Sequence, residues 1–462
     1  MGQNLTRRIV PWLLVLVYLP FAYNSGGRFR SLAYTDFPSF YGGARLAFVE
    51  KHSPYDIAAL RAVAERMEPK RFIEEKRKVY PYLYPPPSLL LFYPVARLPV
   101  ERAKVAMLAF NHVCLLAVVF MLLVPIGGFR VRQVFGELLP AFLVIYLLSS
   151  NGIALTITEA QVNLMVLALL CLTWWGIKHD WPAWAIAPPL AVACLFKMYP
   201  ILLLALLVVR RRSGAAALAG GLLAATAAAA WLVLPHEIWH DWLNNVLPTC
   251  GYFGSPLGVF PSTVAGNISV AGFMARLFLP LKLYIESGRP TLPAIFPYPG
   301  LGKALTLLIV ATMVFGTVAV CHMASRGPVL SAQRRGRQID VQFSAFLILT
   351  FLVAPVAWDH HLAYVAPAAV VAIRGVLQDG RRAGRGRWGA PMVLAAACVI
   401  ALPGSPAHLP LPAPALILLV SFRLYAVLFL WVFMLGELYR SMPVLSVDTQ
   451  LAEVDGTRVA FE

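Results

Sequence analysis

Long apolar runs dominate this sequence, and the short segments between them carry most of its charge. Each run is long enough, or nearly so, to cross ~30 Å of hydrocarbon as a helix. Of the 462 residues, 59% are hydrophobic and 13% are charged, whereas a soluble domain carries about a quarter charged residues. Charged groups are costly inside a bilayer, so this composition excludes a soluble globular domain. It predicts an all-α, polytopic membrane protein.

Hydropathy predicts about twelve transmembrane helices. Arg7 and Arg8 precede the first run, and no small-residue cleavage site follows it, so we expect a retained helix rather than a signal peptide. The run at 181–209 has basic or polar residues on both flanks, so it must cross twice or re-enter, turning near Lys197. The runs cover residues 9–23, 104–126, 134–149, 160–177, 181–209, 215–234, 301–323, 341–356, 362–376, 392–402 and 415–436.

The net charge of +17 is explained by topology rather than by nucleic-acid binding. With the N-terminus inside, four short basic loops fall on the cytoplasmic side, as the positive-inside rule requires. These loops hold Arg130 and Arg132, Arg210 to Arg212, Arg334 to Arg337, and Arg381 to Arg387. The basic stretch 70–78 lies in a long outer loop, and long loops translocate regardless of charge.

We therefore expect one transmembrane domain over residues 1–440, with short interfacial helices in its outer loops at 24–98 and 235–300. Residues 441–462 are predicted to form a cytoplasmic tail, and the protein is predicted to be multi-pass in the inner (plasma) membrane. Polar residues collect on the outer side, which suggests one cavity facing the periplasm or exterior. The expected substrate-binding residues of this cavity are Tyr41, Tyr55, Tyr84, Gln161, Asn163, Asn267 and Arg276.

Asp36 is the candidate general base, because it follows the first span in an aromatic setting. The alternative is a helix N-cap, since Asp before Phe37-Pro38 is a good start signal. The two roles can coexist.

Lys197, His360 and His361 are candidates for binding a phosphate at the membrane surface. For the histidines, an alternative is that one binds a substrate phosphate or hydroxyl while the other caps the span or faces water. Lys197 stands far from the inner Arg210, so a phosphate contact is favoured over snorkelling. The adjacent histidines would point about 100° apart on a helix, which makes a shared metal ion difficult.

His236-Glu237-Ile238-Trp239-His240 has the His-Glu-x-x-His pattern of zinc proteases. It follows Pro235 at the end of a span and contains Trp239, so an interfacial helix with an aromatic belt explains it at least as well. We predict no metal and no cofactor.

Several short motifs, taken in order, resemble glycosyltransferase family 87, the polyprenyl-phosphate-mannose-dependent mannosyltransferases. The resemblance covers roughly residues 8–370. The matching motifs are Asp36-Phe37-Pro38-Ser39-Phe40-Tyr41, Ser53-Pro54-Tyr55-Asp56, Tyr84-Pro85-Pro86, Gln161-Val162-Asn163, Phe196-Lys197-Met198-Tyr199-Pro200, Gly266-Asn267-Ile268-Ser269 and Ala354-Pro355-Val356-Ala357-Trp358-Asp359-His360-His361.

This resemblance implies a GT-C-like fold that moves a sugar, by family analogy mannose, from a polyprenyl-phosphate donor to a hydroxyl of a glycolipid or glycan. Asp36 would be the base, while Lys197 and a histidine of the 360–361 pair would stabilise the departing lipid phosphate. The chain departs from the family in one respect: the family usually has Gly before Gln-x-Asn, where this sequence has Ala160, preceded by Glu159.

Two other functions compete with a transferase. A transporter or flippase of a lipid-linked sugar would use the broken spans near Pro200, but it favours ionisable residues at mid-membrane rather than at the outer rim. A non-catalytic assembly subunit would make Asp36 dispensable. A nucleotide-driven pump is disfavoured, because the sequence has no Walker or Rossmann glycine pattern.

Overall fold

The computed structural model describes residues 16, 18–27, 36–75, 78–126, 138–283, 291–326, 331–379 and 389–442. Within these ranges the chain forms helices joined by turns and loops, together with a β-bridge that pairs Leu281 with Leu292. The predicted all-α fold class is therefore confirmed. The predicted cytoplasmic tail lies almost entirely outside the described residues.

Four of the described helices are long and apolar enough to cross a membrane. They are α5 (Val100–Ile126), α12 (Ser213–Val233), α15 (Pro299–Ser325) and α20 (Phe422–Arg440). Most other apolar runs appear as shorter or partly polar helices. These are α7 (Leu138–Ser149), α9 (Asn163–Lys178), α10 (Ala183–Phe196), α11 (Leu203–Val209), α16 (Ala332–Leu352), α17 (Ala366–Asp379) and α18 (Gly389–Ala401). The figure of twelve spans stays a prediction.

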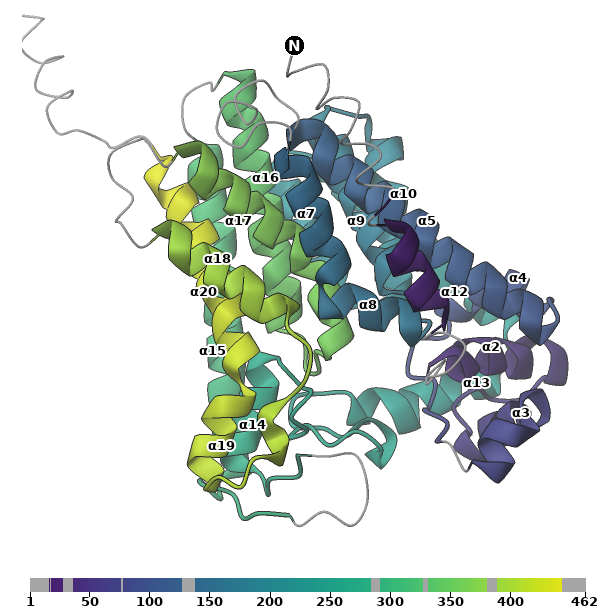
Figure 1. The fold of residues 1–462 in the computed structure, drawn as a ribbon. Helices are drawn as coiled ribbons and strands as arrows, with labels where there is room; N and C mark the ends of the chain where they lie inside the picture. Colours follow the sequence, from purple (N-terminus) through teal and green to yellow (C-terminus); the bar gives the residue numbers. More distant parts are fainter. Residues whose placement is uncertain are drawn as a thin grey trace, which may run out of the picture.

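The helices of the two predicted outer loops lie in the lower half of Figure 1, with those of the first loop on its right side. The first loop contributes three helices and the second contributes two, while the short helix before α20 also lies in this half. They are α2 (Phe37–Arg45), α3 (Ile57–Met67), α4 (Ser88–Ala96), α13 (His236–Asp241), α14 (Val270–Phe278) and α19 (Ala413–Val420).

The apolar run at 181–209 forms a helical hairpin, and whether it crosses the membrane twice or re-enters stays open. Helix α10 leads to a turn at Lys197, and the 3-10 turn Tyr199–Leu202 and α11 return the chain. The two ends meet, because Asp180 forms ion pairs with Arg212 and, at 2.8 Å, with Arg335. With 14 residues, α10 is roughly 21 Å long, shorter than the ~30 Å of hydrocarbon. The prediction of a turn near Lys197 is confirmed.

A buried charge cluster holds the helices together at the end of the bundle where Asp180 pairs with Arg212 and Arg335. Asp340 of α16 is 3% exposed and accepts hydrogen bonds from Lys178 at 2.7 Å and from the Trp174 indole at 3.0 Å. Arg374 of α17 lies 3.4 Å from the same carboxylate. Two of the predicted inner basic clusters lie close to this group. Arg210 belongs to one and donates to Gln338 of α16 at 2.9 Å, and Arg335 belongs to the other and lies on the same helix. The clusters around Arg130 and Arg381 lie outside the described residues.

Helix α8 (Asn151–Thr158) follows α7 and lies toward the helices of the predicted outer loops. It packs against the 3-10 helix η7 (Asp359–Tyr364), and Gly152 makes this contact possible. A Cβ on Gly152 would lie 2.6 Å from the backbone nitrogen of Ala363, closer than real contacts allow. The absence of a side chain at Gly152 therefore brings Glu159, after α8, next to the histidines of η7.

Candidate active site

A cavity of about 410 Å³ lies where the outer segments meet the ends of α8 and α10. Its lining comes from six parts of the chain that are distant in sequence. That this cavity faces the outer side stays a prediction. Six of the predicted site residues line it, namely Asp36, Tyr84, Gln161, Lys197, His360 and His361.

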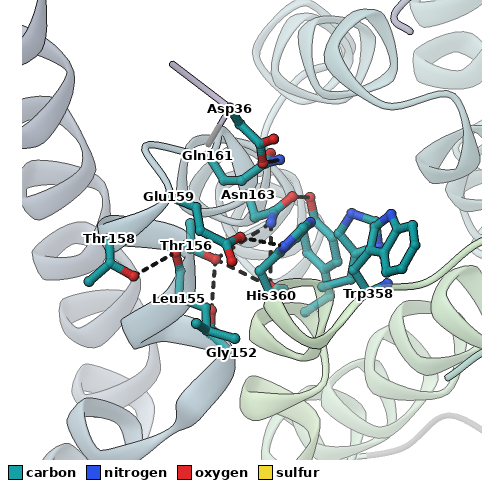
Figure 2. Close-up of polar contacts among 12 residues, drawn as sticks. Asp36, Gly152, Leu155, Thr156, Thr158, Glu159, Gln161, Asn163, Trp358 and His360 are labelled. Atoms are coloured by element: carbon teal, nitrogen blue, oxygen red, sulfur yellow. Dashed lines mark hydrogen bonds and ion pairs between the residues drawn. The ribbon is translucent and has the colours of Figure 1, made fainter. Parts of the chain in front are cut away.

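Asp36 occupies the N-cap position of α2, but its side chain makes no capping hydrogen bond. Instead, its carboxylate accepts a hydrogen bond from the side-chain amide of Gln161. Figure 2 shows these two side chains facing each other above Glu159. Gln161 is held in turn, because its Oε1 accepts from the hydroxyl of Tyr84 at 3.4 Å. Asp36 therefore starts the helix by position, while its carboxylate faces the cavity.

The surroundings of Asp36 raise the pKa of its carboxyl group from 3.8 to about 6. Burial is the largest cause, because it penalises the charged form, and the nearby negative charge of Glu159 is the second. The Gln161 amide and Lys197 act in the opposite direction, and so does His360 when its ring is protonated. A carboxylate with such a pKa is ionised at neutral pH and remains basic enough to accept a proton.

The turn after α8 sets the positions of Glu159 and Gln161. The backbone N–H of Gln161 donates to the carbonyl of Thr156 at 2.9 Å, and that of Ala160 donates to Ile157 at 3.2 Å. This pair of bonds is the Schellman motif, in which the residue after the C-cap adopts a left-handed conformation. That residue is Ala160, with a φ of 53°. The reversal directs Glu159 toward η7 and Gln161 toward Asp36.

Glu159 contacts His360, the first histidine of the pair. Its Oε2 lies 2.7 Å from Nδ1 of His360 (Figure 2). The His360 backbone is held as well, since its carbonyl accepts from Thr156 at 3.2 Å and from Asn163 at 3.4 Å. The other ring nitrogen of His360, Nε2, is buried and has no hydrogen-bond partner among the described residues.

Lys197 contacts His361, the second histidine. Its Nζ and Nε2 of His361 are 3.1 Å apart, and Nδ1 of His361 accepts from the backbone N–H of Trp358 at 3.1 Å. The ammonium also lies 4.9 Å from the centre of the Tyr84 ring, a cation–π distance. The two adjacent histidines thus have different partners, a carboxylate for His360 and an amine for His361.

Asn163 and Asn267 do not line the cavity, and both brace the loop that carries the histidines. Asn163 binds the carbonyl of His360 and accepts from the hydroxyl of Tyr364 at 2.8 Å. Asn267 accepts from the backbone N–H of Ala357 at 3.0 Å and donates to the carbonyl of Ser262 at 3.0 Å.

Tyr41, Tyr55 and Arg276 also lie away from the cavity lining, although the sequence places them among the substrate-binding candidates. The hydroxyls of Tyr41 and Tyr55 donate to backbone carbonyls of the first outer loop, at 2.8 and 2.7 Å. Arg276 is fully buried and donates to the carbonyls of Val264 and Asn267 at 3.1 and 2.9 Å. These side chains support the walls of the site.

Sequence reasoning missed Glu159 and Arg423 as members of the site. Arg423, in the first turn of α20, is 3% exposed and forms an ion pair with Asp359 on the cavity wall. An arginine at the start of a span resembles an interfacial anchor, so nothing local indicates its partner. Glu159 did carry a signal, since it stands where the chain departs from the family pattern.

The arrangement of carboxylates and histidines has consequences for metal binding. One ligand atom from each of Asp36, Glu159 and His360 lies within 4.8 Å of the others, and no further group of this kind occurs among the described residues. This spacing could admit a divalent cation, but the 2.7 Å contact already joins the facing atoms of Glu159 and His360.

The His-Glu-x-x-His pattern falls in the six-residue helix α13, where the His240 side chain is 73% exposed.

Comparison with known proteins supplies the family. No curated protein and no solved structure matches the chain. A family model does match, over residues 82–335, which is more than half of the 462 residues and includes Tyr84, Gln161 and Lys197. The apolar helices agree with this match: the chain belongs to glycosyltransferase family 87 and is a membrane glycosyltransferase.

Proposed function

We propose that the protein transfers a sugar, with mannose as the first candidate, from a polyprenyl-phosphate donor to a hydroxyl of a glycolipid or glycan. Asp36 acts as the general base. The observation that carries this proposal is a carboxylate with a pKa of about 6 in a cavity that also holds Lys197. A lipid-phosphate sugar is already activated, so the reaction needs a base, cationic help for the leaving phosphate, and orientation.

The transfer step uses these residues as follows. Asp36 accepts the proton of the acceptor hydroxyl while the hydroxyl oxygen attacks the anomeric carbon of the sugar. A new carbon–oxygen bond forms, and the bond from the anomeric carbon to the phosphate oxygen breaks. The lipid phosphate leaves with the electron pair, and the ammonium of Lys197 stabilises its charge. Nε2 of His361 lies 3.1 Å from Nζ of Lys197, so the imidazole forms one wall of the phosphate position.

The placement of the cavity supports a reaction on the non-cytoplasmic side of the inner (plasma) membrane. The cavity is lined by Ser39 and Phe40 of α2 and by Cys250, Pro256 and Phe260 of the second predicted outer loop, whereas Arg210 and Arg335 lie at the far end of the helical hairpin. Basic residues mark the cytoplasmic end of a bundle. A donor with a long apolar chain can reach such a cavity from the bilayer.

The test compares wild type with Asp36→Asn in membranes that contain the full-length protein. A radiolabelled polyprenyl-phosphate sugar is supplied with a glycolipid acceptor, and labelled product is measured. We expect transfer by wild type and a loss of about 10²-fold or more in the variant. Asp241→Asn, which alters an outer carboxylate outside the cavity lining, should retain activity. Equal activity in wild type and Asp36→Asn would reject Asp36 as the base.

A transporter of a lipid-linked sugar is the second candidate. The helical hairpin at 181–209 favours it. Broken helices with a charged residue at the break often form transport sites, and Lys197 stands at such a break. The same membranes distinguish the two functions. Movement of the intact donor between leaflets without any labelled product, with several donors, would favour transport.

A further inference from the structure

The cavity divides into two parts with opposite chemistry. Asp36, Glu159 and His360 form one part, in which one polar atom from each residue lies within 4.8 Å of the others. Lys197 and His361 form the other part, joined by their 3.1 Å contact. The proposed function places the donor phosphate at the cationic part. The carboxylate part is then left for the acceptor.

The proton arrangement on His360 follows from its contact with Glu159. A carboxylate only accepts hydrogen bonds, so Nδ1 of His360 carries the hydrogen that points to Glu159 at 2.7 Å. In the neutral ring this leaves a lone pair on Nε2. His360 lines the cavity and is 8% exposed, and its Nε2 has no hydrogen-bond partner within the part of the chain that the structure describes. A buried nitrogen without a partner is unusual in a folded protein, and a bound ligand is the natural candidate.

The chemistry of that ligand follows from the three groups. Asp36, Glu159 and Nε2 of His360 all accept hydrogen bonds, so they recognise hydrogen-bond donors such as sugar hydroxyls. A phosphate offers few donors at neutral pH, and two neighbouring carboxylates would repel it. The cluster therefore favours an uncharged group over an anionic one.

We propose that Asp36, Glu159 and His360 form an acceptor subsite for an uncharged sugar that presents two neighbouring hydroxyls. One hydroxyl gives its proton to Asp36, and the second donates a hydrogen bond to Nε2 of His360. Glu159 is the positioning residue, because it fixes the hydrogen on Nδ1 and its charge excludes anionic acceptors. This assignment rests on the proposed function and specifies its acceptor.

The position of Glu159 supports a specialised role. It stands at the C-cap of α8, next to Ala160, which adopts a left-handed conformation. Its side chain is 28% exposed and lies on the cavity wall, so it is accessible to a bound acceptor. A carboxylate that only stabilised the helix end would be unfavourable there, because the C-terminus of a helix carries a partial negative charge. The contact of Glu159 with Nδ1 of His360 instead indicates that it positions this imidazole.

The experiment measures transfer by the purified full-length protein to three acceptors. They are an alkyl hexoside, the same hexoside lacking one hydroxyl of a neighbouring pair, and the same hexoside carrying a ring phosphate. Wild type should use the neutral hexoside with a kcat/KM about tenfold or more above that of the phosphorylated one. The deoxy acceptor should also be poorer by about tenfold or more, since it leaves a buried group unpaired.

Glu159→Gln should narrow the neutral-to-phosphorylated ratio by about threefold or more and leave the KM for the donor unchanged. The control is Glu101→Gln, which alters a carboxylate that is 82% exposed on α5 and should keep the wild-type ratio. Equal or better use of the phosphorylated acceptor by wild type would overturn the subsite, and so would an unchanged ratio in a folded Glu159→Gln protein. Transfer to any acceptor would still uphold the proposed function. Failure with every acceptor and donor would overturn both.

Discussion

The side-chain amide of Gln161 donates a hydrogen bond to the carboxylate of Asp36, although 125 residues separate them in the chain. Asp36 starts the first helix of the outer loop, and Gln161 follows the turn after α8. The bond orients a carboxylate that faces a 410 Å³ cavity together with Lys197. It stabilises the ionised form of Asp36, whereas burial and Glu159 disfavour it.

The balance of these effects predicts the pH dependence of sugar transfer. A general base must be ionised, and the pKa of Asp36 is raised to about 6. The rate should therefore increase as the pH rises through about 6 and fall off below it, which kcat/KM measured across this range will show. A rate that is constant from about pH 5 to pH 7 would contradict Asp36 as the titrating base. The groups whose interactions with Asp36 shape this titration are Glu159, His360, Gln161, Lys197 and Tyr84.

Removal of the Gln161 amide should move this pH dependence in a defined direction. Because the amide donates to the charged carboxylate, it lowers the pKa of Asp36. In Gln161→Ala the acid limb of the profile should shift to higher pH, and the loss of the bond that orients the carboxylate should lower the rate at pH 7 by about tenfold. Gln333→Ala, at an exposed position of α16, is the matched control. A shift to lower pH would contradict this account.

Lys197 is expected to matter for the donor more than for the acceptor. Lys197→Met keeps the length of the side chain and removes its charge, so the KM for the donor should rise and kcat should fall by about 10²-fold. Lys303→Met, at the exposed start of α15, should behave as wild type. His361→Ala in the Lys197→Met background should add little, because residues in direct contact act as a unit. Fully additive losses would show that His361 does not act through Lys197.

Transfer should withstand removal of divalent cations. Lys197 supplies positive charge for the leaving phosphate, and the facing atoms of Glu159 and His360 are joined at 2.7 Å. Purified protein treated with EDTA should therefore keep its wild-type rate, with its elution volume in gel filtration as the check on folding. Loss of activity that Mg²⁺ or Mn²⁺ restores would instead assign an ion to the group formed by Asp36, Glu159 and His360.

The sequence was a good guide to which residues surround the cavity and a poor guide to how they pair. Asp36, Gln161 and Lys197 could be found because ionisable or amide groups beside apolar runs are costly unless they have a function. Their partners could not be found, since the contact between Glu159 and His360 depends on the close approach of α8 to η7 at Gly152. No residue pattern within α8 or η7 predicts that close approach.

A polar residue in apolar surroundings can be structural rather than functional, and sequence alone does not distinguish the two roles. Asn267 and Arg276 satisfy backbone carbonyls of irregular loops, which must be paired when they are buried. Hydropathy likewise marks only the apolar part of α16, although Asp340 and Gln338 belong to this helix and are buried against charged partners. A residue scale treats such groups as solvent-exposed, so the predicted span at 341–356 begins nine residues after Ala332, where the helix starts.

The left-handed residue Ala160 gives a prediction about stability. Its φ of 53° is a conformation that costs a residue with a Cβ about 1 kcal/mol or more, and glycine adopts it freely. Ala160→Gly should therefore raise the free energy of unfolding by up to about 1 kcal/mol, although it also increases the freedom of the unfolded chain. The matched control is Ala154→Gly, inside α8, which should destabilise the protein by about 0.5–1 kcal/mol. Thermal unfolding of the two variants in detergent measures the contrast. If both variants destabilise the protein equally, the Schellman turn that positions Glu159 and Gln161 is not formed as described.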